Sequence, residues 1–218
     1  MTTFDSTKSS LSDLLREIRS GKIQLPDFQR GWVWDDDHIR DLLVSIARSF
    51  PIGAVMLLEA GGEVRFQTRP IEGLEGKIPL GQQPEKLILD GQQRLTTLTQ
   101  TLVLEEPVNT RTAKGKRIQR HYYFDIRKAV ESPHNLDEAV IAVDDNRQLR
   151  SNFGRDVELD LSTRELECQQ LYFPCSQIMS SDDWEATLHQ VAPDQFSVYM
   201  TDRKSTRLNS SHGYKSYA

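Results

Sequence analysis

The sequence predicts an α+β fold with a small mixed sheet and packed helices. Short apolar runs typical of strands alternate with stretches of helical periodicity over residues 1–130. Clusters rich in glycine and proline separate these runs and indicate turns. Interspersed strands and helices are typical of α+β and α/β domains. The length of 218 residues fits one domain, with or without an appendage.

Three helices are predicted where apolar residues recur at helical spacing. The first covers residues 10–21, with Ser10 as its N-cap and Gly21 as its stop. The second covers 36–49 and the third 92–104. Each has an apolar face that would pack against a sheet.

Strands are predicted for short runs rich in aliphatic or aromatic residues. These runs cover residues 22–26, 53–58, 63–68, 86–89 and 121–126, of which 53–58 has the composition of a buried strand. Residues 69–85 are rich in glycine and proline, and residues 107–119 are polar and basic, so both are predicted to be loops. Beyond residue 131 the sequence is acidic and predicts only scattered short elements.

The composition indicates the cellular compartment of the protein. No apolar run approaches the roughly 20 residues of a membrane span, and the first residues lack the features of a signal peptide. Cys168 and Cys175 match no common zinc or redox spacing, so we expect ordinary thiols in a reducing compartment. These observations predict a cytoplasmic protein that is not bound to a membrane.

The charge distribution bears on nucleic-acid binding. A net charge of −5 argues against a surface that is basic throughout. A local patch remains compatible with it, and the segment Arg111–Arg120 is the best candidate for DNA because it gathers five basic residues. The alternative is a solvated loop without a partner.

The stretch "LILDGQQRLTTL", residues 87–98, places five polar residues between a predicted strand and a predicted helix. The free N–H groups and the dipole at a helix N-terminus favour an anion. Gly91 allows a sharp turn and the close approach of a ligand, while Arg94 could bind a phosphate through two N–H donors. Alternatively, Asp90 caps the helix and Arg94 pairs with an acid. Neither a GxxxxGK[ST] loop nor a GxGxxG motif occurs in the chain.

A second polar cluster lies within residues 25–43. Gln29 and Arg30 stand between aromatic residues, which could form a platform for a nucleotide base. Trp32 and Trp34 could equally form a hydrophobic staple at the start of the following helix. The acidic run 35–37 could hold a metal ion, but such runs at a helix start are more often caps.

Together, these two clusters resemble the N-terminal domain of the GmrSD-type restriction endonucleases. The resemblance covers about residues 10–130 and depends on the DGQQR motif and the FQR and PIG blocks before it. It implies a ParB/sulfiredoxin-like nucleotide-binding fold. It also implies a regulatory module that hydrolyses a nucleoside triphosphate, with Mg²⁺, in antiphage systems that attack modified DNA.

The resemblance also implies the residues of the nucleotide site. The implied catalytic residues are Asp90 and Arg94, and the implied nucleotide-binding residues are Gly91, Gln92, Gln93, Gln29 and Arg30. No separate metal site formed by protein ligands is expected. Two alternatives remain: a non-catalytic module that senses nucleotide or DNA, and a structural fragment without activity.

The C-terminal part departs from the family pattern. Family members commonly carry an HNH-type nuclease domain, but no matching cluster of His and Asn or Asp follows residue 130. We therefore expect a 10–130 domain, a truncated region over 131–201, and a nuclease supplied by a partner or by a missing part of the chain. Residues 202–218, "DRKSTRLNSSHGYKSYA", resemble translated sequencing-adapter sequence and are predicted to be a foreign tail without packing partners.

Overall fold

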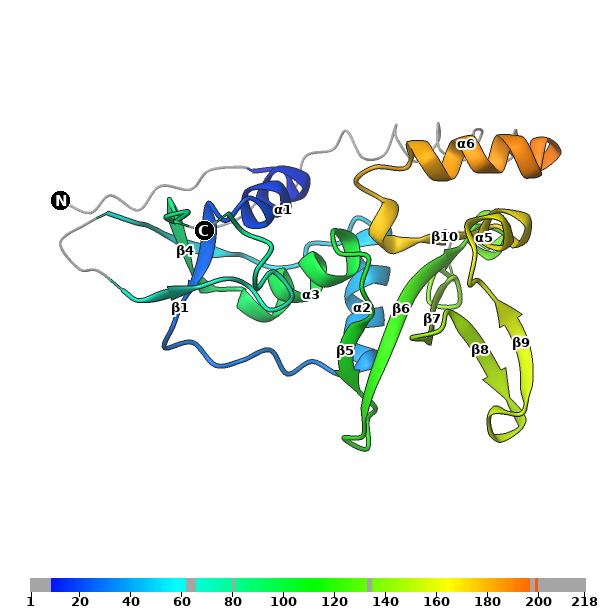
Figure 1. Ribbon diagram of the computed structural model, residues 1–218, viewed down its shortest axis with the longest axis horizontal. Helices are drawn as coiled ribbons and strands as arrows, with labels where there is room; N and C mark the ends of the chain where they lie inside the picture. Colours follow the sequence, from blue (N-terminus) through cyan, green and yellow to red (C-terminus); the bar gives the residue numbers. More distant parts are fainter. Residues whose placement is uncertain (1–8, 62–65, 80, 133–134, 197–198, 200–218) are drawn as a thin grey trace.

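The computed structural model describes residues 9–61, 66–79, 81–132, 135–196 and 199 (Figure 1). The α-helices are α1 (Leu11–Arg19), α2 (Asp36–Ala47), α3 (Gln92–Leu102), α4 (Ile126–Glu131), α5 (Arg164–Gln170) and α6 (Asp182–Val191). The strands are β1 (Ile23–Pro26), β2 (Met56–Glu59), β3 (Thr68–Arg69), β4 (Lys86–Asp90), β5 (Val108–Arg111), β6 (Arg117–Asp125), β7 (Val140–Asp144), β8 (Gln148–Ser151), β9 (Asp156–Asp160) and β10 (Tyr172–Pro174). Two short 3₁₀ helices cover Asn152–Gly154 and Cys175–Gln177. This mixture of small sheets and helices confirms the α+β class.

The first sheet is small and mixed, with the strand order β2-β4-β1-β3. Strands β1 and β4 are parallel, whereas β2 and β3 pair with them in antiparallel orientation. A parallel pair needs a long connection, and here that connection contains α2 and both outer strands. Helix α3 follows β4 directly, so the polar residues 90–94 lie where the strand ends and the helix begins.

The second sheet is built around the long strand β6. Strands β5, β7 and β10 all pair with β6 in antiparallel orientation. Residues 131–196 therefore contribute two strands to a sheet whose central strand precedes residue 130. The β8–β9 pair forms a separate hairpin, which projects to the same side as β5 and β6 (Figure 1).

One hydrophobic core joins the two sheets. Leu15 and Leu95 come from helices of the N-terminal part, while Tyr122 and Val140 come from the second sheet, and all four are buried in this core. Burial of each large apolar side chain contributes about 1.5–3 kcal/mol to folding. The packing therefore fixes the β5–β6–β7 sheet against the part of the chain that carries the DGQQR motif.

The C-terminal helices cover a smaller core. Trp184 of α6 is fully buried, and its ring packs edge-on against Phe173 of β10 with 5.0 Å between ring centroids. Next to it lies the buried carboxylate of Glu167, which accepts a hydrogen bond from Tyr123 Oη at 2.8 Å and one from Arg147 Nη1 at 3.1 Å. Burial raises the pKa of Glu167, while these two donors oppose the shift.

Several expectations from the sequence are confirmed. The Ser10 hydroxyl accepts the Asp13 N–H at the start of α1, and Gly21 follows the end of that helix with a positive φ of 79°. Asp35 caps α2 through the His38 N–H, as the interpretation of the acidic run as a cap predicts. Both cysteines are free and buried, and burial raises the pKa of the Cys168 thiol to about 12, which fits ordinary unreactive thiols.

Three expectations are wrong in part. Residues 107–119 are not a loop, because β5 and the start of β6 form a hairpin there, and β6 begins at Arg117 rather than at residue 121. Strand β2 is an edge strand, so Met56 and Leu58 stay exposed although their run has a buried composition. Of the predicted strand 63–68, only Thr68 lies in β3, and residues 63–65 are outside the described residues.

The tail 202–218 also lies outside the described residues, so its expected lack of packing partners stays a prediction. Among the described helices, none combines the length and the apolar composition that crossing a bilayer requires.

Candidate functional site

The joint between β4 and α3 is open to a ligand. Gly91 occupies the N-cap position of α3 with a φ of 89°, and no side chain caps the first turn of the helix. An added Cβ at Gly91 would lie 3.1 Å from Val55 Cγ2, so the glycine is needed for both its conformation and its packing. The alternative in which Asp90 caps the helix is therefore wrong. Its carboxylate is instead 72% exposed.

Three glutamine side chains hold residues 28–34, which we call the pocket segment, against this joint. Gln29 Nε2 donates to the backbone oxygen of Ile88 at 2.6 Å. From the other side, Gln92 Nε2 donates to the Arg30 oxygen at 2.5 Å, and Gln93 both donates to Gly31 O and accepts the Val33 N–H. The amides thus have structural partners, and their role is to place the pocket segment opposite α3.

Arg94 holds a second loop in place. Its guanidinium donates to the backbone oxygens of Ile52 and Ala54, which flank Gly53 in the PIG block. The distance from Arg94 Nη2 to Asp90 Oδ2 is 3.8 Å, so this ion pair is long. Two of the five N–H donors of a guanidinium are used in these two hydrogen bonds. Sequence reasoning missed this role, although the PIG block was the available signal.

The two polar clusters meet around one open pocket of about 510 Å³. It is lined by Phe28, Gln29, Arg30, Trp34, Leu89, Asp90, Gly91, Gln92, Gln93 and Arg94. All seven residues expected at the nucleotide site are among them, so the structure brings the predicted residues together. The volume lies in the range typical of small-molecule sites.

Two charged side chains remain free in this pocket. Arg30 is exposed, and none of the ion pairs or side-chain hydrogen bonds between described residues involves its guanidinium. Asp90 has only the long contact to Arg94. An exposed basic group and an exposed acidic group thus line the same pocket as the uncapped helix end.

The aromatic residues divide between pocket and core. Phe28 lines the pocket with 67% of its surface exposed, and its ring contacts that of Phe66 at 5.5 Å between centroids. Trp34 lines the pocket and also packs against the core, whereas Trp32 packs on the core without lining the pocket and donates its Nε1–H to Thr97 Oγ1 at 2.9 Å. Phe28 and Trp34 are therefore the candidates for the base platform, and Trp34, directly before the Asp35 N-cap, also has the position of a hydrophobic staple.

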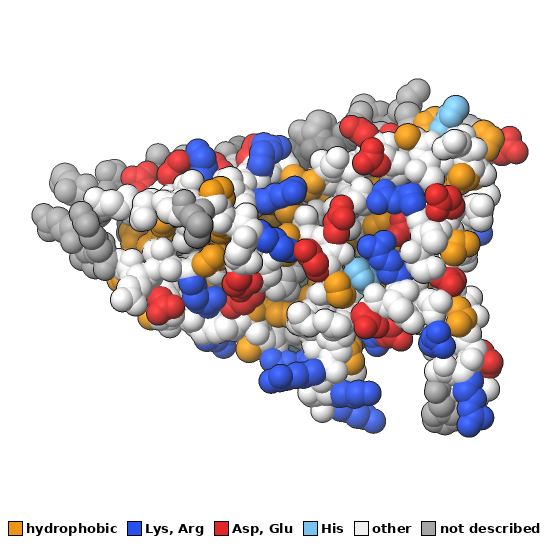
Figure 2. All heavy atoms as spheres, viewed as in Figure 1, with side chains coloured by type: hydrophobic (Ala, Val, Ile, Leu, Met, Phe, Trp, Pro, Cys, Tyr) orange, Lys and Arg blue, Asp and Glu red, His pale blue; other side chains and the backbone are white. Residues whose placement is uncertain are grey.

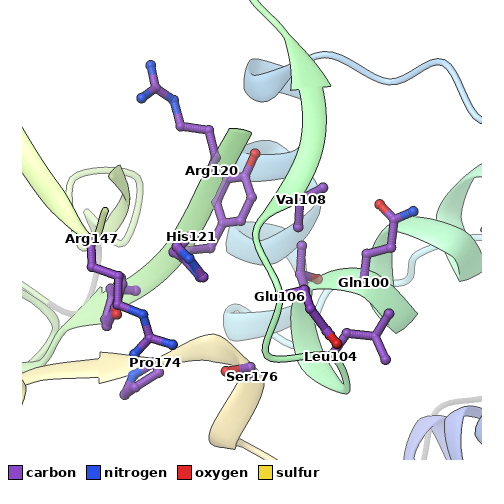
Figure 3. Close-up of a pocket in the computed structure, with 12 residues that line it drawn as sticks. Gln100, Leu104, Glu106, Val108, Arg120, His121, Arg147, Pro174 and Ser176 are labelled. Atoms are coloured by element: carbon purple, nitrogen blue, oxygen red, sulfur yellow. The ribbon is translucent and has the colours of Figure 1, made fainter. Parts of the chain in front are cut away.

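Two further cavities lie elsewhere in the described part of the chain. The one between α3, β5, β6 and β10 measures about 20 Å³, which is room for one water molecule (Figure 3). His121 lines it, and burial together with the charge of Arg147 lowers the pKa of this histidine. A hollow of about 530 Å³ beside Lys77 contains the Lys77–Glu106 ion pair, at 2.6 Å. Among the described residues, no cluster of three His, Cys, Asp or Glu is placed to hold a metal ion.

We expect Gly53→Ala to destabilise the protein by about 1–3 kcal/mol, because the φ of 92° disfavours a side chain and the new Cβ would overlap Arg94 Nη1. Urea denaturation would measure the loss. Gly76→Ala is the matched control, since Gly76 has a φ of 73° but open space around its Cβ position. Equal losses of unfolding free energy in the two variants would show that the overlap with Arg94 does not contribute to the destabilisation.

Comparison with known proteins identifies the family of this chain. The family model of the GmrSD restriction endonuclease N-terminal domain matches residues 11–200. An uncharacterized protein from Methanocaldococcus jannaschii is 28% identical over 199 residues. The match covers 88% of this chain and 33% of that relative, so the chain spans about a third of its length. On the extent of the family match, this chain belongs to the GmrSD restriction endonuclease N-terminal domain family.

Proposed function

We propose that this chain binds and hydrolyses a nucleoside triphosphate and thereby regulates a restriction system that attacks modified DNA. The observation that carries the proposal is the pocket in which Arg30, Asp90 and the uncapped N-terminus of α3 face one space. Membership of the family supports the restriction context. The base of the nucleotide would stack on Phe28, whose exposed ring lines the same pocket.

In this proposal the phosphates lie at the start of α3. The backbone N–H groups of the first turn and the helix dipole favour negative charge there. Arg30 would bind the phosphates with its free guanidinium, and Arg94 would add its remaining donors. Asp90 would orient the attacking water.

Mg²⁺ fits this arrangement as a partner of the nucleotide. It commonly binds through one or two carboxylates together with phosphate oxygens. Asp90 is the carboxylate that lines the pocket, and its exposure leaves it available. The ion would neutralise phosphate charge as the terminal bond breaks.

Two further elements of the proposal concern the whole system. The lobe around the pocket would have the ParB/sulfiredoxin-like architecture. DNA cleavage would come from an HNH-type nuclease in a partner subunit or in a further part of a longer chain. Both follow from the family resemblance, and the 33% coverage of the archaeal relative is consistent with additional domains in related proteins.

A non-catalytic module that senses nucleotide or DNA is the second candidate. One observation favours it: the amides of Gln29, Gln92 and Gln93 and part of the Arg94 guanidinium are committed to backbone oxygens. Asp90 is then the main group left for catalysis. A pocket with so few free groups is better suited to binding a nucleotide than to hydrolysing it.

Two measurements on the same protein separate these candidates. Calorimetric titration with several nucleoside triphosphates and Mg²⁺ tests binding, and release of inorganic phosphate tests turnover. Binding with turnover supports the proposal, and binding without turnover supports the sensing module. If no nucleotide bound at millimolar concentration, the proposal and the nucleotide-sensing form of the second candidate would be overturned, and only a DNA-sensing module would remain. Arg30→Ala should weaken binding without altering stability, because its side chain contacts solvent.

A further inference from the structure

The hairpin of β5 and β6 ends in four exposed basic residues, which we call the basic tip: Arg111, Lys114, Lys116 and Arg117. The hairpin projects from the body, and blue side chains gather at its end (Figures 1 and 2). The turn is ordered by backbone hydrogen bonds from Thr112 to Lys116, at 2.9 Å, and from Gly115 to Thr112, at 2.8 Å. The four charges are therefore presented on a folded turn.

The basic tip forms no ion pair within the described part of the protein. Arg111 lies directly opposite Arg117 in the strand register, and like charges at such positions are destabilising. No Asp or Glu occurs between Glu106 and Asp125. The ion pairs between described residues include Arg120, at the base of the hairpin, with Asp144, but none of the four residues of the tip. An anionic partner would remove this repulsion.

The shape of the hairpin points to duplex DNA as that partner. The major groove of B-DNA, about 12 Å wide, admits a two-stranded ribbon of this kind. With a net charge of −5, the rest of the protein repels a polyanion, so a projecting tip is the place where contact can occur. We propose that the basic tip enters the groove of duplex DNA and binds its phosphates, and that this contact is coupled to the nucleotide pocket.

Two hydrogen bonds connect the β5–β6 hairpin to the region of the nucleotide pocket. Thr110 Oγ1, on β5, donates to the backbone oxygen of Trp34 at 2.9 Å, and Trp34 lines the pocket. Beside it, Tyr122 Oη donates to Asp36 Oδ1 at 2.8 Å. The pKa of Asp35 is lowered chiefly by hydrogen bonds from His38, and the charge of Arg111 adds to this effect. The pocket segment is thus held by the glutamines at one side and by the hairpin at the other.

Through this path a ligand that shifts Trp34 also shifts the root of the hairpin. Coupling between two binding sites is reciprocal, so nucleotide must change the affinity for DNA by the factor by which DNA changes the affinity for nucleotide. This part of the inference rests on the proposed function, whereas the binding of DNA by the basic tip does not.

DNA binding is tested without nucleotide. We expect Lys114→Gln/Lys116→Gln to weaken binding to a fluorescent duplex and to reduce the slope of log K against log salt by about 2, because two phosphate contacts are lost. Lys22→Gln/Lys77→Gln is the matched control, since it removes the same charge from residues paired with acids outside the hairpin. It should bind like the wild type.

Three outcomes would overturn the DNA contact. The first is an unchanged slope in the tip variant, and the second is an equal loss in the control. The third is equally tight binding of a single strand of the same length, because groove entry requires a duplex. Circular dichroism spectra of both variants should match the wild type, since all four lysines are surface residues.

The coupling is tested with Thr110→Val, which removes the hydroxyl, and Thr110→Ser, which keeps it. In the wild type and in Thr110→Ser we expect the DNA dissociation constant to change when nucleotide is bound. In Thr110→Val both ligands should still bind, but each independently of the other. Equal DNA affinity with and without bound nucleotide in the wild type would overturn the coupling. Absence of any nucleotide binding would overturn the proposed function instead, while the salt-slope result would still decide the DNA contact.

Discussion

Asp90→Ala should lower the rate of nucleotide hydrolysis by about 10²-fold or more, because a positioned carboxylate that orients water or metal typically contributes that much. The fold should remain intact, since the side chain is 72% exposed and makes one long ion pair. Phosphate release under saturating nucleotide would measure the rate, and circular dichroism would report the fold. Asp41→Asn, on the exposed face of α2, is the control for removing an exposed acid. Unchanged turnover in folded Asp90→Ala protein would remove Asp90 from the catalytic site.

Arg94→Ala should also abolish hydrolysis, but for two reasons that the structure separates. Its loss removes phosphate donors, and it leaves the backbone oxygens of Ile52 and Ala54 without their partner. The Ile52 oxygen is partly buried, and the cost of about 1–3 kcal/mol for a buried unsatisfied acceptor is the upper bound for its loss, so this variant should unfold at lower denaturant concentration than Asp90→Ala. Gln29→Ala should have a smaller effect on turnover, because its amide N–H groups donate to backbone oxygens of β4 although the residue lines the pocket.

Trp184→Ala should destabilise the protein by about 3–5 kcal/mol, the usual cost of removing a fully buried tryptophan. Trp184 has no exposed surface and packs against Phe173 and Tyr199. For a chain of this size such a loss lowers the melting temperature by about 10 °C. Thermal unfolding followed by circular dichroism would measure it, with Trp184→Phe as the milder control.

The same experiment tests how the C-terminal part relates to the pocket. Because β6 pairs with β7 and β10 and shares the main core, we expect a single transition in which the pocket unfolds together with α6. Two transitions in Trp184→Ala, with the first leaving nucleotide binding intact, would show that residues 131–196 form an independent unit. An unchanged melting temperature would contradict the burial of Trp184.

Much of the N-terminal part was predictable because its determinants are local. Ser10, Gly21 and Asp35 mark helix ends through side-chain and backbone geometry within a few residues, and the structure confirms them. The position of the DGQQR motif between β4 and α3 was equally predictable from the apolar runs on both sides of it. The sequence of residues 131–196 predicted secondary structure only weakly. Its strands β7 and β10 are short, and both depend on pairing with β6, which lies earlier in the chain.

The β5–β6 hairpin shows why composition misled. Residues 107–119 are polar and basic, which favours a loop, but Val108 and Thr110 point into the core and the register with Arg117–Arg120 makes the segment a ribbon. Strand β2 shows the opposite error. Its aliphatic residues suggested burial, yet β2 lies at the edge of its sheet, and Met56 and Leu58 remain exposed.

By itself the sequence determined the α+β class, the approximate positions of α1, α2 and α3, and seven of the ten residues that line the pocket, since these depend on local pattern and on motif chemistry. Only the tertiary structure decided what those residues touch. The glutamine amides and the Arg94 guanidinium find their acceptors on segments about 40 to 60 positions away in the chain. Hydrogen bonds between such distant segments form only when the core has brought them together, which no local pattern encodes. For that reason the free charges of Arg30 and Asp90, and the link from Trp34 to the basic tip, became visible only in the folded protein.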